Sequence, residues 1–116
     1  MGSYNRFRGD QASESKHLLT DILHDDWGFG GFTITDFIFT LRDGIKAIKA
    51  GMDMEKPIPV HFGQELKQAV ETEKLSEKTL DRTILRVLKT QLSFKNTGAH
   101  GLSFPDWSQR GRCHLE

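Results

Sequence analysis

Two carboxylates stand where an α/β protein usually places its chemistry. Asp36 closes the segment FTITD (32–36), and Glu55 closes the segment MDME (52–55). Both segments alternate apolar and polar residues with period two, which is typical of short β-strands. In parallel α/β architectures, ligands bind at the carboxyl ends of the strands, where polar groups on loops converge. Asp36 and Glu55 are therefore the first candidates for a chemical role.

Each of these carboxylates also has a structural interpretation that comes first by default. Asp36 fits the N-cap of the helix that follows it, because an aspartate there accepts hydrogen bonds from free backbone N–H groups. Glu55 fits a carboxylate that is solvated or paired with an arginine beside the turn at Pro57 and Pro59. The residue types alone leave both interpretations open.

Other motifs favour structural roles. The glycines of GFGG (28–31) precede a strand, whereas a phosphate-binding glycine loop follows a strand and opens a helix. His17 and His24 are seven residues apart, and no HExxH or CxxC motif accompanies them, so we expect no metal site. No cofactor is indicated.

The charges argue against nucleic acid as a partner. Sixteen Lys and Arg residues balance sixteen Asp and Glu residues, which leaves no basic excess for a phosphate backbone. The helix predicted after Ser76 carries four cations, but Glu77 and Asp81 offset them, so a solvated face is expected there.

Length and apolar content limit the fold class. The 116 residues suit one domain or a piece of one, whereas a complete (β/α)₈ barrel takes about 250 residues. The apolar runs are too short to span a membrane. The opening residues MGSYNRFRGD lack the apolar stretch of a signal peptide, and the single Cys113 leaves the compartment unknown.

Periodicity predicts helices that alternate with short strands. Helices are expected over 13–27, capped by Ser13 with Glu14 in the first turn, over about 41–51, after Gly63 and from Ser76 to Thr90. Leu75 and Leu80 fit a hydrophobic staple around Ser76. Strands are expected over 32–36 and 52–55, with a further one at 4–6. This order predicts βαβ units, namely about three parallel strands and four helices over 1–94, followed by an irregular tail over 95–116.

Several motifs resemble glycoside hydrolase family 3, the family of many β-glucosidases. The resemblance rests on Tyr4-Asn5, on SESKHLLTDIL (13–23), on WGFGGFTITD (27–36) and on KAIKAGMDME (46–55), and it fades within LSEKTLDRTILRVL (75–88). These motifs occur in the family's order over about 90 residues. The resemblance implies a partial TIM-barrel segment from the C-terminal part of the family's barrel domain.

The same resemblance implies a site. Asp36 corresponds to the family's catalytic nucleophile, while Met1, Tyr4 and Phe37 correspond to positions that line the sugar subsite. Tyr4 would donate a hydrogen bond that orients Asp36. Three positions depart from the family pattern: Phe37 replaces a tryptophan, Lys56 a methionine and Gly30 an aspartate. None of these departures removes the nucleophile.

The resemblance also implies what lies elsewhere. The family's general acid/base comes from a later domain, and its upstream sugar-holding residues have no counterpart in this sequence. The expected partners are therefore a β-glucoside or oligosaccharide substrate, the remainder of the barrel and the acid/base domain, without nucleic acid or membrane. Two hypotheses follow: a retaining β-glucosidase segment that carries the nucleophile, or a non-catalytic α/β fragment that does not hydrolyse glycosides on its own.

Overall fold

The computed structural model describes residues 1–96, and the predicted irregular tail lies almost entirely outside them. The described chain begins with a two-stranded antiparallel sheet, β1 (Arg6–Phe7) and β2 (Asp10–Gln11). A 3₁₀ helix, η1 (Ala12–Glu14), a π-helix, η2 (His17–Asp26), and a 3₁₀ turn, η3 (Ile38–Thr40), come next. Three α-helices complete it: α1 (Gly44–Ala50), α2 (Gln64–Glu71) and α3 (Glu77–Asn96).

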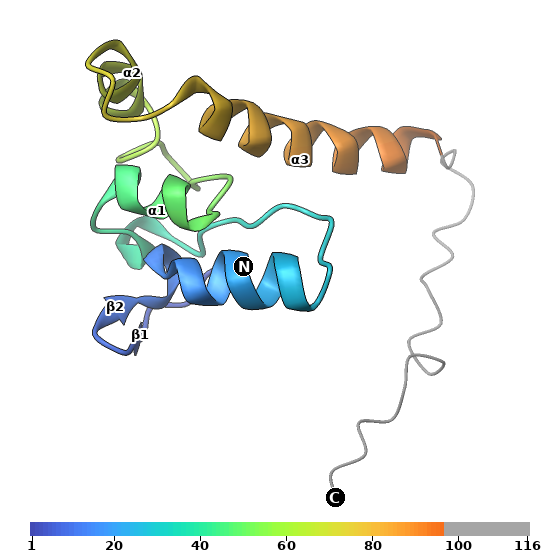
Figure 1. Cartoon of the computed structure of the whole chain (residues 1–116), viewed down its shortest axis with the longest axis horizontal. Helices are drawn as coiled ribbons and strands as arrows, with labels where there is room; N and C mark the ends of the chain where they lie inside the picture. Colours follow the sequence, from blue (N-terminus) through green and yellow to red (C-terminus); the bar gives the residue numbers. More distant parts are fainter. Residues whose placement is uncertain (97–116) are drawn as a thin grey trace, which may run out of the picture.

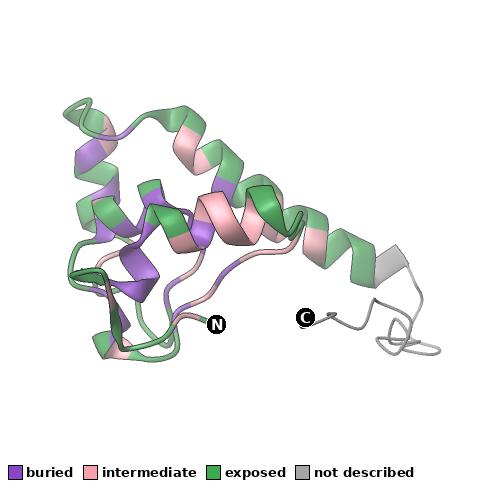
Figure 2. Ribbon diagram, turned by 60° about the horizontal axis from the view of Figure 1, so that its bottom comes forward, coloured by how far each residue is buried: buried purple, intermediate pink, exposed green. Residues whose placement is uncertain are grey.

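Helix α1 is the centre of the molecule. It contacts η1, η2, α2 and α3 (Figure 1). Ala47 and Ala50 face a cluster with Leu19, Leu41 and Met52, where small side chains allow close packing. Ile48, on the other side of the helix, packs in a second cluster with Leu66, Ala69 and Leu75. Figure 2 shows buried residues concentrated in and around α1, whereas most of α3 is exposed.

The ends of α1 follow from local chemistry. The carboxylate of Asp43 accepts the N–H of Lys46 at 2.8 Å and caps the helix. Gly51 ends it in a left-handed conformation with φ of 113°, which a residue with a Cβ rarely adopts. At the first helical residue, a Cβ on Gly44 would lie 2.8 Å from the backbone oxygen of His61, so the loop after Pro59 packs directly against the helix.

The predicted parallel sheet is reduced to one bridge. Ile34 and Met54 form an isolated parallel bridge, supported by the hydrogen bond from Thr35 N–H to the Met54 carbonyl at 2.9 Å. Gly2 N–H donates to the Ile34 carbonyl at 2.7 Å, which attaches the first residues to the same segment. Within residues 1–96 the two expected strands therefore meet in parallel, but they do not extend into a three-stranded sheet.

Two predictions near the N-terminus are wrong. Of the strand expected at 4–6, only Arg6 belongs to a strand, and β1 pairs antiparallel with β2 because a tight turn at Arg8 and Gly9 reverses the chain. The helix expected over 13–27 is divided into η1 and η2. Ser13 Oγ does not cap a helix but donates to the Ser3 carbonyl at 3.2 Å, so the first turn stays separate.

The other three predicted helices are confirmed as α1, α2 and α3, with shifted boundaries. Leu75 is buried and packs with Leu80, as expected for the staple at the start of α3. The second helix begins at Gly44 rather than near Leu41, because Asp43 is its N-cap. Among residues 1–96, no helix is both long and apolar enough to cross a membrane.

Candidate active site

Asp36 follows a residue that is held firmly. Thr35 is 1% exposed, and its N–H donates to the Met54 carbonyl. The Thr35 hydroxyl accepts the N–H of Lys56 at 2.8 Å and lies 3.2 Å from the Lys56 carbonyl, to which it donates. Threonine suits this position because one hydroxyl can accept and donate at once. The backbone that presents Asp36 is therefore fixed against the segment that ends at Glu55.

The Asp36 side chain itself is exposed. Within residues 1–96 no hydrogen bond or ion pair engages its carboxylate. It does not cap the next helix, since Asp43 holds that position in α1. The structural interpretation of Asp36 as a helix cap is therefore wrong, and the carboxylate is left accessible at the end of the bridged segment.

Phe37 stands beside Asp36 with 51% of its surface exposed. Its backbone is anchored by Thr40, whose hydroxyl accepts the Phe37 N–H at 3.1 Å and contacts the Phe37 carbonyl at 2.7 Å. Phe39 in the same turn is 63% exposed. Aromatic faces that are exposed next to a carboxylate can pack against an apolar face of a ligand.

Met1 and Tyr4 are both exposed, at 83% and 46%. The hydrogen bond between Gly2 and Ile34 places their segment next to the one that carries Asp36. No hydrogen bond among the described residues joins Tyr4 to Asp36. The structure thus brings the expected subsite segments together at the backbone, while the expected orienting bond from Tyr4 is not formed.

Glu55, the other candidate, is 8% exposed and engaged in structure. Its Oε2 accepts the N–H groups of His61 at 2.8 Å and Phe62 at 2.6 Å, which closes the loop over 56–62. Its Oε1 is buried without a partner among the described residues. The carboxylate is buried from solvent, and no arginine of residues 1–96 pairs with it, so within the described residues both expected forms of its structural role are wrong. It holds a loop instead.

The sequence reasoning also missed a buried ion pair. Asp53 Oδ1 accepts from Arg86 Nη2 at 2.6 Å and Nε at 2.9 Å, and Oδ2 accepts the Thr33 N–H at 2.9 Å. The Arg86 side chain is only 15% exposed. Arg82, one turn earlier, donates to the Ile48 carbonyl at 3.3 Å. The expectation that the cations of α3 form a solvated face is wrong for Arg86, whereas Arg82 remains exposed.

Glu14 is a second buried carboxylate that sequence reasoning assigned to another role. It is 5% exposed, and its Oε1 accepts the backbone N–H groups of Arg42 and of Asp43, the latter at 2.9 Å. It therefore ties η1 to the start of α1 instead of favouring its own helix end. Its position directly after Ser13 gave no signal of this long-range contact.

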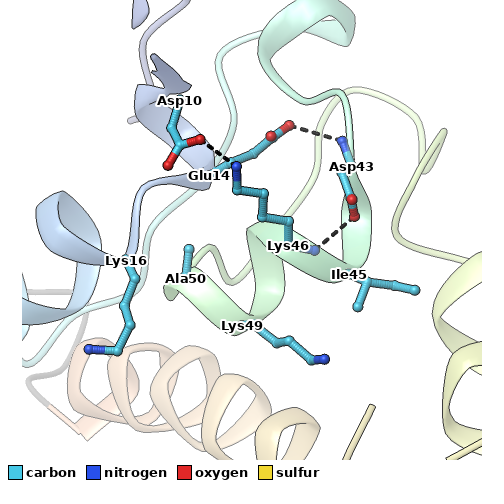
Figure 3. A pocket seen from close by; sticks show the side chains of 8 residues that line it. All are labelled: Asp10, Glu14, Lys16, Asp43, Ile45, Lys46, Lys49 and Ala50. Atoms are coloured by element: carbon cyan, nitrogen blue, oxygen red, sulfur yellow. Dashed lines mark hydrogen bonds and ion pairs between the residues drawn. The ribbon is translucent and has the colours of Figure 1, made fainter. Parts of the chain in front are cut away.

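A pocket of about 370 Å³ lies beside Glu14, between β2 and α1. Figure 3 shows the side chains that line it. Its charges are largely paired: Lys46 Nζ contacts Asp10 Oδ1 at 2.5 Å, and this hydrogen bond raises the pKa of the Lys46 ammonium above its usual value. Asp36 does not line this pocket. The candidate site therefore lies in an open position at the end of the bridged segments and not in this hollow.

The site offers one free carboxylate and aromatic surface. A carboxylate in this state can act as a nucleophile or a base. Residues 1–96 do not include a cluster of three or more His, Cys, Asp or Glu side chains able to hold a metal ion.

Comparison with known proteins identifies the family. The profile described as the glycosyl hydrolase family 3 N terminal domain matches residues 1–90. The chain belongs to glycoside hydrolase family 3. Relatives include the probable beta-glucosidase J of Neosartorya fischeri, 42% identical over 77% of this chain, and the thermostable beta-glucosidase B of Acetivibrio thermocellus, 34% identical over 77%.

Solved structures of the family agree. Beta-glucosidase 3B from Thermotoga neapolitana is 31% identical, covers 80% of this chain and has a TM-score of 0.70. The beta-glucosidase DesR from Streptomyces venezuelae is 26% identical over 89% of this chain, with a TM-score of 0.73. The chain spans only 10 to 12% of those two relatives and 14 to 15% of these two solved chains. It is similar to a part of each enzyme.

Proposed function

We propose that residues 1–94 are a segment of the barrel domain of a retaining β-glucosidase, taken from its C-terminal part, and that Asp36 is the catalytic nucleophile. The observation that carries this proposal is the contrast around Asp36. The preceding residue is locked by hydrogen bonds, while the carboxylate is exposed and unpartnered among the described residues. The sequence relatives named as β-glucosidases supply the reaction class.

The proposed chemistry follows the retaining mechanism. Two carboxyl groups about 5 to 5.5 Å apart act on the glycosidic bond. Asp36 would attack the anomeric carbon, the bond to the leaving oxygen would break as the acid protonates that oxygen, and water would then hydrolyse the glycosyl ester. The substrate is a β-glucoside or oligosaccharide with a terminal β-D-glucosyl residue. The reaction needs no metal or organic cofactor.

The remainder of the barrel and an acid/base domain would complete the site. In that setting the segments around Gly2, Ile34 and Met54 would be three neighbouring parallel strands, with Met1, Tyr4 and Phe37 lining the sugar subsite. Tyr4 would then reach Asp36 as a donor. The Gly2 to Ile34 hydrogen bond and the Ile34–Met54 bridge support this arrangement.

A chimera tests the nucleophile. Residues 1–90 replace the matching segment of Thermotoga neapolitana β-glucosidase 3B, and the chimera is treated with a 2-fluoro-glucoside that carries a good leaving group. Because such a substrate needs little help from the acid, it isolates the nucleophilic step. We expect the label in the peptide that contains residues 32–42.

Matched variants show whether the label depends on Asp36. Asp36→Asn should lose the label, while Asp26→Asn, at another exposed aspartate, should keep it. A label on Glu55, or full turnover by the Asp36→Asn chimera, would remove the assignment.

The second candidate is a non-catalytic fragment of the same fold. It is favoured by the structural engagement of Glu55, the other candidate carboxylate, whose Oε2 accepts two backbone N–H groups. General acid catalysis contributes about 10²- to 10⁴-fold, so its loss suppresses turnover of an unactivated disaccharide. We expect the purified chain alone to release no glucose from cellobiose. Release that disappears in Asp36→Ala would contradict this expectation.

A further inference from the structure

An apolar hollow of the described residues lies away from Asp36, between α2 and α3. It has a volume of about 620 Å³. Its floor is formed by Phe62, Leu66, Val70, Leu80 and Ile84. Ile84 is 51% exposed. We call this hollow the α2–α3 groove.

The rim of the α2–α3 groove is acidic. Glu71 from α2 and both Glu77 and Asp81 from α3 line it, against the single cation Lys67. None of the three carboxylates forms an ion pair or side-chain hydrogen bond within residues 1–96. An apolar floor under an acidic rim is complementary to a segment with large apolar side chains followed by cations.

The chain carries such a segment beyond α3. Residues 102–112 read LSFPDWSQRGR, with Leu102, Phe104 and Trp107 followed by Arg110 and Arg112. Tryptophan and arginine are the residue types most often found at the energetic centre of interfaces. This segment also lies beyond residue 90, where the match to the family ends, so the family's barrel leaves it without an assigned role.

The distances allow the segment to reach the groove. Ile84 precedes Asn96, the end of α3, by about 18 Å along the helix axis. Residues 97–102 span up to about 20 Å when extended, so Leu102 can reach Ile84. Five further residues bring Trp107 past Leu80, and the arginines then lie within reach of Glu77 and Glu71.

We propose that residues 102–112 bind the α2–α3 groove of the same chain. Leu102, Phe104 and Trp107 cover the apolar floor, and Arg110 and Arg112 face the acidic rim. Connection through a short segment gives the two partners a high effective concentration, so modest contacts suffice. The proposal concerns an interaction surface and is independent of whether Asp36 is a nucleophile.

Fluorescence of Trp107 tests the proposal in the full chain. The chain has two tryptophans, and Trp27 is 74% exposed, so a Trp27→Phe background isolates Trp107. We expect Trp107 to emit at shorter wavelength, and to be quenched more slowly by acrylamide, than in a synthetic peptide of residues 97–116. Equal emission and equal quenching would overturn the proposal.

A pair of variants on α3 locates the binding surface. Ile84→Asp places a charge in the groove and should shift Trp107 emission to the red with loss of protection. Leu92→Asp is the matched control, because Leu92 is 55% exposed on the same helix but does not line the groove. Far-UV circular dichroism checks that each variant keeps its helices. An equal response to both variants would overturn the assigned surface.

Charge-reversal variants provide a second test that does not depend on the folding of Ile84→Asp. Glu71→Arg with Asp81→Arg should reduce Trp107 protection, and adding Arg110→Glu with Arg112→Glu should restore it. Asp25→Arg with Asp26→Arg, at exposed positions outside the groove, should have no effect. Failure of the restoring pair would contradict the proposal. Protection that grows with chain concentration would show the segment of a second copy and would overturn binding within one chain.

Discussion

Asp53 and Asp36 belong to the two segments that meet at the Ile34–Met54 bridge, yet their carboxylates are in opposite environments. Asp53 is buried and accepts from Arg86 and from the Thr33 backbone, while Asp36 is exposed and has no partner among the described residues. A buried carboxylate whose oxygens accept several hydrogen bonds holds elements of the fold together. One that is left open at the end of a fixed segment is available for chemistry.

The largest loss of stability is expected from substitution of Asp53, the buried carboxylate of this comparison. Asp53→Ala would leave the Arg86 guanidinium buried without a counter-charge, and such a loss typically costs about 3 to 5 kcal/mol. Urea unfolding followed by circular dichroism should show a strong fall in the midpoint. Asp53→Leu combined with Arg86→Met removes both charges and should cost less than Asp53→Ala. Equal stability of wild type and Asp53→Ala would mean that the pair does not hold α3.

Substitution of Glu55 should cost less stability than substitution of Asp53. Glu55 is buried too, but its hydrogen-bond donors are backbone N–H groups and not a charged side chain. Glu55→Ala would leave the N–H groups of His61 and Phe62 without their acceptor, at a cost of about 1 to 3 kcal/mol. Amide hydrogen exchange at those two residues should accelerate together with the loss in unfolding free energy. If exchange there stays slow, the loop over 56–62 has another anchor.

Substitution of Asp43, the exposed N-cap of α1, should lower the free energy of unfolding by a still smaller amount. Asp43→Ala removes the acceptor for the Lys46 N–H at the start of α1, which typically costs about 1 kcal/mol. Asp43→Asn, which keeps a capping oxygen, is the matched control and should unfold near the wild-type midpoint. A larger loss in Asp43→Asn than in Asp43→Ala would indicate that the side chain does not act as a cap.

The smallest effect on folding is expected at Asp36. Asp36→Asn changes an exposed side chain without partners in residues 1–96, so the free energy of unfolding should change by less than about 0.5 kcal/mol. The same substitution should abolish labelling in the chimera. Marked destabilisation by Asp36→Asn would mean that Asp36 has a structural role after all, and the contrast with Asp53 would disappear.

Local patterns were sufficient for much of the fold. Gly51 ended α1 as expected, because only a residue without a Cβ adopts its backbone conformation readily, and Leu75 and Leu80 marked the start of α3. Asp36 was expected at the end of an alternating segment, and the structure leaves this residue exposed there. These features depend on neighbours within a few residues, and the sequence contains those neighbours.

The errors concern contacts between distant residues. Arg86 pairs with Asp53, 33 positions away, and Glu14 accepts from Arg42 and Asp43, nearly 30 positions away. A charged residue on a helix has the same local pattern whether its side chain faces solvent or a buried carboxylate. The wrong prediction of a three-stranded parallel sheet has the same origin, because strand pairing depends on which distant segments lie side by side.

The contact between Gly44 and His61 has a consequence for anyone who wishes to stabilise this protein by redesign. Replacing a glycine inside a helix with alanine normally adds up to about 1 kcal/mol through helix propensity. At Gly44 the added methyl group would meet a backbone oxygen at 2.8 Å and force the adjoining loop outward. A glycine-to-alanine substitution that stabilises a solvent-exposed helix would here loosen the loop that Glu55 closes. The first turn of α1 therefore cannot be stabilised by raising helix propensity at Gly44.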